Sequence, residues 1–127
     1  MKPVLVDTSV WINHFKNHNA SLIKLLTLDL VLTHPMVLLE LACGTPPSPR
    51  KQTLSDLGLI TQARQASMNE VMQLIEAEKL YGLGCGLVDI SLLASTLITP
   101  GTELWTMDKR LLVLTERFGV QYQEILH

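Results

Sequence analysis

Residues 4–11 read Val4-Leu5-Val6-Asp7-Thr8-Ser9-Val10-Trp11, a short apolar run that ends at an acid and two hydroxyl residues. An uninterrupted apolar run of this kind is typical of a strand buried on both faces, as in a parallel sheet. The acid and hydroxyls favour a capping turn, and we expect a helix from about Val10, with Trp11 and Phe15 on one face. A strand followed at once by a helix favours an α/β fold.

The rest of the chain repeats this alternation of short apolar runs and helical periods. Pro35 suits the first position of a helix that runs to Cys43, and Gly44 suits the cap that ends it. Ser67 and Glu70 have the spacing of a capping box. We expect further strands at 30–33 and 104–106, an edge strand at 120–122, and helices that follow Asn19, end near Gly58, open at Ser67, open at Asp89 and open at Asp108. The sequence thus predicts a single domain over residues 1–127, of class α/β, with a mostly parallel central sheet.

Composition narrows the class of protein. The 127 residues are 47% hydrophobic and 17% charged, which permits a packed core and argues against disorder. A mean hydropathy of +0.27 is high for a soluble monomer, so a second copy or a partner is expected to cover part of the surface. Cys43 and Cys85 are too few and too far apart for a disulfide framework or a zinc site. With no signal-peptide pattern and no apolar run long enough for a membrane span, we expect a cytoplasmic protein.

Acidic residues recur at the ends of predicted strands or on the helices that follow them. Asp7 and Asp108 come after strands, while Asp89 and Glu40 stand on helices that can face the same edge of the sheet. Ligands of parallel α/β sheets bind at the carboxyl ends of the strands, so these acids are expected to converge. Each Asp could instead be an ordinary helix N-cap. Glu40 is the one charge in an apolar helix, where it is either paired and buried or placed on a narrow solvent stripe.

Four converging carboxylates would suit a hard divalent cation, Mg²⁺ or Mn²⁺, with water completing the coordination. Such a site can activate water and stabilise the leaving oxygen in phosphodiester cleavage. The net charge of −2 is not that of a typical nucleic-acid binder. It is a poor guide here, because setting aside four metal-binding acids leaves 8 of the 12 acidic residues against 10 basic ones.

Four blocks of the sequence, in order, resemble those of a PIN domain, and most of all the VapC toxins of bacterial type II toxin–antitoxin pairs. They are residues 4–12, 40–44, 86–95 and 104–111, each containing one of the acids. The resemblance implies a three-layer α/β/α fold, Mg²⁺- or Mn²⁺-dependent endoribonuclease activity, a homodimer and a VapB-type antitoxin. It makes Asp7, Glu40, Asp89 and Asp108 the catalytic metal ligands, with Ser9 and Thr106 as supporting hydroxyls. Residues 45–66 match no motif.

Other signals are weaker. His14 and His18 have a spacing that could bind zinc, but no partner ligand stands near them, and a solvated helix end is the better interpretation. Gly82, Gly84 and Gly86 lack the spacing of a phosphate loop, and we interpret them as a hinge before Asp89. Lys109 and Arg110 either hold a substrate phosphate or point into water.

Three other classes of metal-binding protein fit the sequence less well than the nuclease. A metal-dependent adhesion module would need a serine at position 11, where Trp11 stands. A receiver domain would need a second acid beside Asp7, and a haloacid-dehalogenase-type phosphatase would need one at Ser9. A PIN-like fold that binds without catalysis is the main alternative.

Overall fold

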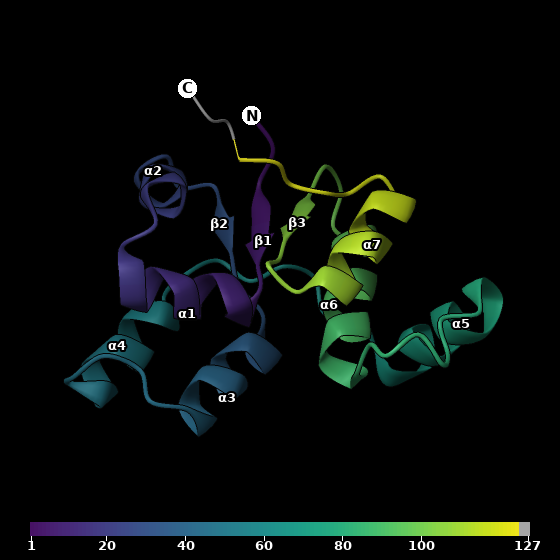
Figure 1. Ribbon diagram of the computed structural model, residues 1–127, viewed down its shortest axis with the longest axis horizontal. Coiled ribbons are helices and arrows are strands. Elements are labelled where there is room, and N and C mark those ends of the chain that lie inside the picture. The colour runs from purple at the N-terminus through teal and green to yellow at the C-terminus, as the bar shows by residue number, and fades with distance from the viewer. Residues whose placement is uncertain (125–127) are drawn as a thin grey trace.

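The computed structural model describes residues 1–124 and has a small parallel sheet with helices on both sides (Figure 1). The elements in chain order are β1 (Val4–Val6), α1 (Thr8–Asn17), α2 (Ala20–Thr27), β2 (Val31–Leu32), α3 (Pro35–Cys43), α4 (Arg50–Leu57), α5 (Met68–Glu78), α6 (Leu87–Ile98), β3 (Glu103–Trp105) and α7 (Lys109–Arg117). The expected α/β class with a parallel sheet is confirmed.

The first strand of the chain is the middle strand of the sheet. The order is β2-β1-β3, and β1 pairs in parallel with both neighbours. All three residues of β1 are buried, which explains its uninterrupted apolar sequence. Because the three strands run the same way, their carboxyl ends lie at one edge of the sheet. The chain leaves β1 at Asp7 and β3 at Thr106 along this edge.

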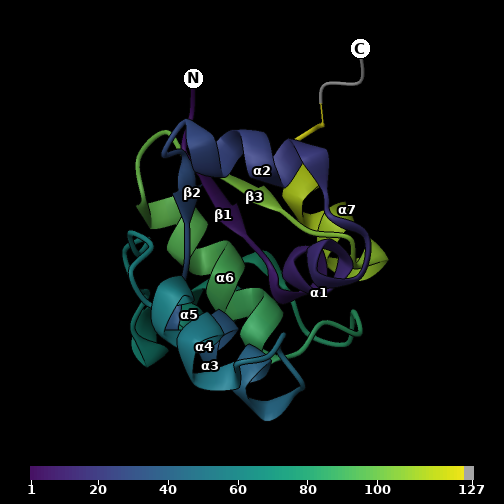
Figure 2. The same ribbon diagram turned by 90° about the vertical axis from the view of Figure 1, so that its left-hand side faces the viewer.

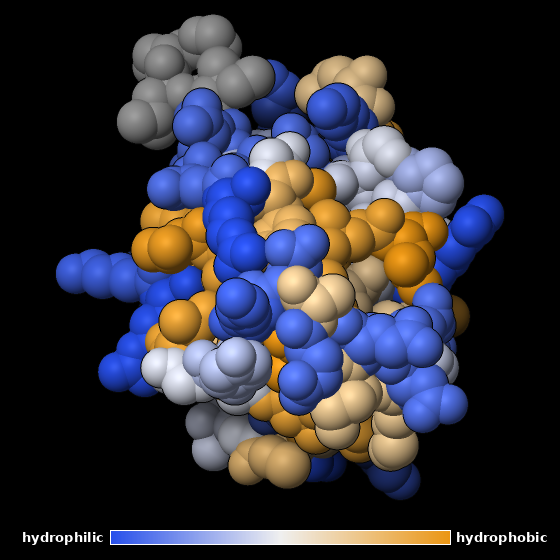
Figure 3. Space-filling view, turned by 90° about the vertical axis from the view of Figure 1, so that its right-hand side faces the viewer, coloured by the Kyte–Doolittle hydropathy of each residue, from blue (hydrophilic) through white to orange (hydrophobic). Residues whose placement is uncertain are grey.

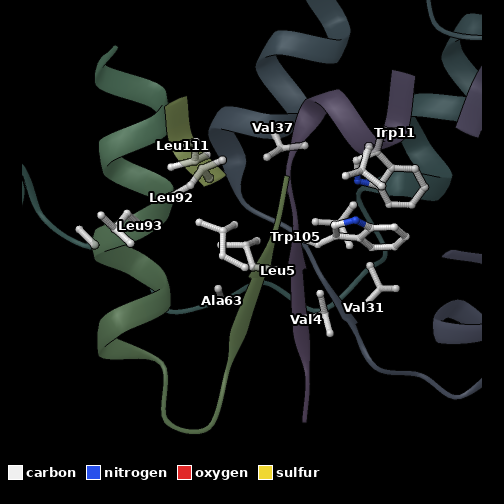
Figure 4. Packing of buried hydrophobic residues seen from close by; sticks show 14 of the residues in the cluster. Val4, Leu5, Trp11, Val31, Val37, Ala63, Leu92, Leu93, Trp105 and Leu111 are labelled. Carbon is white, nitrogen blue, oxygen red and sulfur yellow. The ribbon is translucent and has the colours of Figure 1, made fainter. Parts of the chain in front are cut away.

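Helices enclose the sheet from two sides. In Figure 1, α1 to α4 lie on one side of the strands and α5 to α7 on the other, and the turned view in Figure 2 shows α6 behind the strands. Figure 4 shows the core on both faces of the sheet: Leu5 points toward Leu92 and Leu93 of α6 and Leu111 of α7, whereas the Trp105 side chain lies on the opposite face, near Trp11. None of the helices within residues 1–124 has the length and apolar run that crossing a membrane requires.

Several predicted boundaries are confirmed by the hydrogen bonds at helix starts. Asn19 caps α2 through a bond from Leu22 N (3.0 Å), Pro35 opens α3, and Ser67 and Glu70 form the predicted capping box. His14 and His18 lie at the end of α1, as expected. His14 Nδ1 accepts from Asn19 N, and His18 has a left-handed backbone.

Other boundaries differ from the prediction. Helix α1 begins at Thr8 instead of Val10, and α6 begins at Leu87 with Gly86 as its N-cap, so Asp89 is the third residue of the helix and not its cap. Gly44 ends α3 with an extended backbone and not a left-handed one. The edge strand at 120–122 is reduced to one bridge, between Gln121 and Leu104.

Candidate acidic active site

Asp7 lies at the centre of the candidate site and is 4% exposed. A buried carboxylate must be matched by hydrogen-bond donors, since its desolvation is costly. Three donors meet it: the backbone N of Thr8 (2.8 Å), Ser9 Oγ (2.7 Å) and Thr106 Oγ1 (2.7 Å). Asp7 is therefore both the N-cap of α1 and a fixed anion at the end of β1.

The two hydroxyls predicted to support the site join the ends of two strands. Ser9 Oγ and Thr106 Oγ1 both donate to Asp7 Oδ2 and lie 3.4 Å apart. Each hydroxyl oxygen also accepts from the β3–α7 turn, Ser9 Oγ from Met107 N (2.9 Å) and Thr106 Oγ1 from Asp108 N (3.0 Å). This network fixes the turn that carries Asp108 against the carboxylate of Asp7.

Asp108 acts as the N-cap of α7. Its Oδ1 accepts from Arg110 N (2.9 Å) and Leu111 N (3.1 Å). The capping interpretation is thus right for Asp7 and Asp108, but it does not exclude a second role. The cap uses Oδ1 of Asp108, and the residue as a whole is exposed at the same edge as Asp7.

The pKa of Asp89 indicates that the other acids lie near it. Its pKa is raised above the ordinary carboxyl value, first by desolvation and then by the negative charges of Asp7 and Asp108, with Glu40 adding a smaller effect. A hydrogen bond from the Gly86 backbone acts in the opposite direction. Asp7, Asp108 and Glu40 therefore all lie within electrostatic reach of Asp89.

Glu40 lies at the surface of the site, although its neighbours in the sequence are apolar. It is exposed, so the solvent-stripe interpretation is right and a buried carboxylate is wrong. Its Oε1 accepts a hydrogen bond from Thr8 Oγ1 (2.6 Å), which ties α3 to the start of α1. Sequence reasoning missed Thr8, although it stands beside Asp7 and its hydroxyl was a visible signal.

A metal ion fits the chemistry of this donor set, although the protein does not form a complete cage. Within residues 1–124, no three acidic, histidine or cysteine side chains are close enough together to hold an ion by themselves. Mg²⁺ commonly needs only one or two carboxylates, because it keeps several of its water ligands. Carboxylates whose mutual repulsion raises a pKa would gain from a cation between them.

Basic and sulfur side chains border the acids. Lys109 and Arg110 are both exposed in the first turn of α7, and Arg110 Nη1 donates to Gly84 O (3.2 Å). Cys85 lies nearby: its pKa is raised by desolvation and by Asp89 and Asp108, while Arg110 opposes the rise. No sequence pattern indicated that Cys85 lies beside the acids.

A hollow of about 540 Å³ opens next to the site. Phe15 and Ile12 of α1 and Leu41 of α3 provide its apolar lining, and Lys16 and Glu40 its charges. The Pro46–Pro47 stretch closes one side. Trp11, in contrast, is 3% exposed and packs in the core.

Two curated proteins are similar to the chain along nearly its whole length. They are ribonuclease VapC32 of Mycobacterium tuberculosis strain CDC 1551 / Oshkosh and ribonuclease VapC32 of strain ATCC 25618 / H37Rv. Each is 40% identical over 121 residues, which cover 95% of this chain and 97% of the relative. No protein-family model matches the sequence. The parallel sheet, the acids at its edge and this similarity together show that the chain belongs to the VapC family of PIN-domain ribonucleases.

Proposed function

We propose that the protein is an endoribonuclease toxin that hydrolyses RNA phosphodiester bonds with Mg²⁺ or Mn²⁺ bound by Asp7, Asp89, Asp108 and Glu40. The observation that carries the proposal is the coupling of Asp89 to the other three acids at the carboxyl edge of a parallel sheet. The ribonuclease name of both relatives supports the reaction type.

Asp7 and Asp89 have different parts in the proposed site. Asp7 is held rigidly by three donors and provides a fixed charge to which a cation can bind. Asp89 has a raised pKa because burial and the other acids disfavour its charge, so a cation bound beside it would relieve this repulsion and would hold the attacking water. A bound Mg²⁺ or Mn²⁺ would supply the Lewis acidity that lowers the pKa of that water.

Lys109 and Arg110 are our candidates for holding the substrate phosphate. Both are exposed beside Asp108, where their charges offset part of the repulsion between RNA and the acids. The bond from Arg110 to Gly84 uses one of its five N–H donors, so the guanidinium keeps others for a phosphate.

We also propose a VapB-type antitoxin as the inhibitor and the hollow beside Glu40 as its binding place. Apolar side chains of a partner would contact Phe15 and Leu41 there, and its charged groups would meet Lys16 and Glu40. Occupying this hollow would cover an acid of the site. A variant Phe15→Ala should therefore bind the antitoxin more weakly while it still cleaves RNA.

A homodimer in the cytoplasm completes the proposal. Figure 3 shows hydrophobic patches between hydrophilic side chains on one face of the molecule, and Met72 and Val113 are among the exposed apolar residues. Burying such side chains against a second copy would be favourable. Light scattering should report about twice the 14.2 kDa chain mass, and a clean monomer at micromolar concentration would refute the dimer.

The decisive experiment is cleavage of a labelled single-stranded RNA by the purified protein. EDTA should abolish cleavage, and Mg²⁺ or Mn²⁺ should restore it. Asp7→Asn should be inactive under the same conditions. RNA binding without cleavage at any metal concentration would identify a binding module instead, and cleavage that survives thorough chelation would refute the metal site.

A further inference from the structure

A buried histidine joins the two helices that carry Glu40 and Asp89. His34 is 4% exposed and is the N-cap of α3, and Ser95 lies in α6 with 0% exposure. His34 Nε2 and Ser95 Oγ are 3.1 Å apart. The pair thus forms a buried polar contact between the start of α3 and α6.

The hydrogen bonds around the ring define its protonation. Met36 N donates to His34 Nδ1 at 3.0 Å, so this nitrogen must be an acceptor, and Nε2 must carry the proton that is donated to Ser95 Oγ. Ser95 Oγ also accepts from Ala66 N (3.1 Å), which attaches the segment before α5 to the same point. Desolvation lowers the pKa of His34, which keeps the imidazole neutral.

Each member of the pair lies on the same helix as one of the acids, or caps that helix. Glu40 follows His34 by six residues, and Asp89 precedes Ser95 by six, so each acid lies about 9 Å along its helix from the contact at ~1.5 Å per residue. A tilt of about 6° of either helix at the contact would move its acid by about 1 Å. A displacement of that size is enough to cost ~100-fold in rate.

We infer that His34 and Ser95 are positioning residues, which set the placement of Glu40 relative to Asp89 through the contact between α3 and α6. The inference rests on the proposed function, because it concerns the geometry of the same acidic site. Neither residue touches substrate, and both act through the helices that they join.

The experiment separates the two ring nitrogens. His34→Asn keeps an oxygen near the position of Nδ1 and so keeps the helix cap, but it cannot reach Ser95. His34→Gln places its amide N–H near the position of Nε2 and so keeps the contact, but it loses the cap. Ser95→Ala removes the contact from the other side. Asn19→Ala deletes the cap of α2, a helix that carries none of the acids, and serves as the control.

Mn²⁺ affinity is measured by calorimetry without RNA, together with the melting temperature and with kcat and KM on a labelled RNA. His34→Asn and Ser95→Ala should each weaken Mn²⁺ binding and lower kcat by about tenfold, with KM little changed, as is common for groups that orient metal ligands. His34→Gln and Asn19→Ala should melt at lower temperature and yet keep Mn²⁺ affinity within about threefold.

Two results would overturn the inference: wild-type Mn²⁺ affinity in both His34→Asn and Ser95→Ala, or affinities that simply follow the melting temperatures of the four variants. Imidazole ¹⁵N NMR of the wild type tests the starting geometry, since a proton on Nδ1 of His34 would equally refute it. A wild-type protein that neither binds Mn²⁺ nor cleaves RNA would refute the proposed function, and the inference with it.

Discussion

Replacing Thr106 by valine tests whether the strand ends are held by the charge of Asp7. Thr106 is 5% exposed, and valine has nearly the same shape, so the change removes the hydroxyl and little else. Two hydrogen bonds are lost, the one to Asp7 Oδ2 at 2.7 Å and the one from Asp108 N at 3.0 Å. Asp7 would then keep two of its three donors.

The expected loss of stability follows from the kind of bond that is broken. A hydrogen bond to a charged group contributes about 1.5–3 kcal/mol, and the exposed Asp108 turn lets water replace the second bond at small cost. We therefore expect Thr106→Val to lower the free energy of unfolding by about 2–3 kcal/mol. At ~2.1 cal/mol/K per residue, the 127 residues convert this into a fall of about 7–11 °C in melting temperature.

Urea unfolding of the metal-free protein at pH 7, followed by circular dichroism, measures the difference. The matched control is Thr115→Val, which is equally buried but donates to a neutral acceptor, the carbonyl of Leu112, at 2.7 Å. That variant should lose only about 1 kcal/mol. If Thr106→Val is no less stable than Thr115→Val, the charge of Asp7 does not strengthen the bond, and our account of the site's rigidity is wrong.

Three further changes probe the same region. Asp89→Asn should abolish cleavage and raise the melting temperature of the metal-free protein at pH 7; since the folded pKa is raised above 3.8, this gain should vanish as pH falls toward 3.8, and a gain independent of pH would contradict the coupling. Gly84→Ala and Gly82→Ala should both destabilise, because both have positive φ, but only Gly84→Ala should raise KM for RNA, because its Cβ would lie 3.0 Å from the Arg110 side chain and displace it; equal KM values would show that this contact is unimportant. Mn²⁺ at 100 times its Kd should stabilise the wild type by about 2.7 kcal/mol, and Asp7→Asn should gain much less.

Much of the fold could be predicted because local signals and burial agree. The run at β1, the proline at the start of α3 and the capping box at Ser67 are decided within a few residues, and each is confirmed. The start of helix α6 was placed three residues late, because Asp89 resembles a cap while Gly86, with no side chain, serves as one. The predicted edge strand at 120–122 is a single bridge in the structure, because Gln121 alone among these residues pairs with β3.

The site was harder to read, because its details depend on contacts between distant residues. The exposure of Glu40 is set by how α3 packs on α1, and its partner Thr8 lies 32 residues away. The proximity of Cys85 to the acids and the contact between His34 and Ser95 also arise from tertiary packing. No local pattern marks such pairs. Which side chains hold a metal stays a prediction.

The central position of the first strand has a consequence for how a toxic enzyme is made. Strand β1 leaves the ribosome well before its partner in residues 103–105 is synthesised, and the acids are spread from residue 7 to residue 108. At ~5–20 residues per second, about 5–20 s of translation separate the first acid from the last. Throughout that interval the nascent chain cannot assemble the proposed nuclease site. A cell that makes the proposed antitoxin at the same time would thus have several seconds to bring it to the ribosome before the new chain can cut RNA.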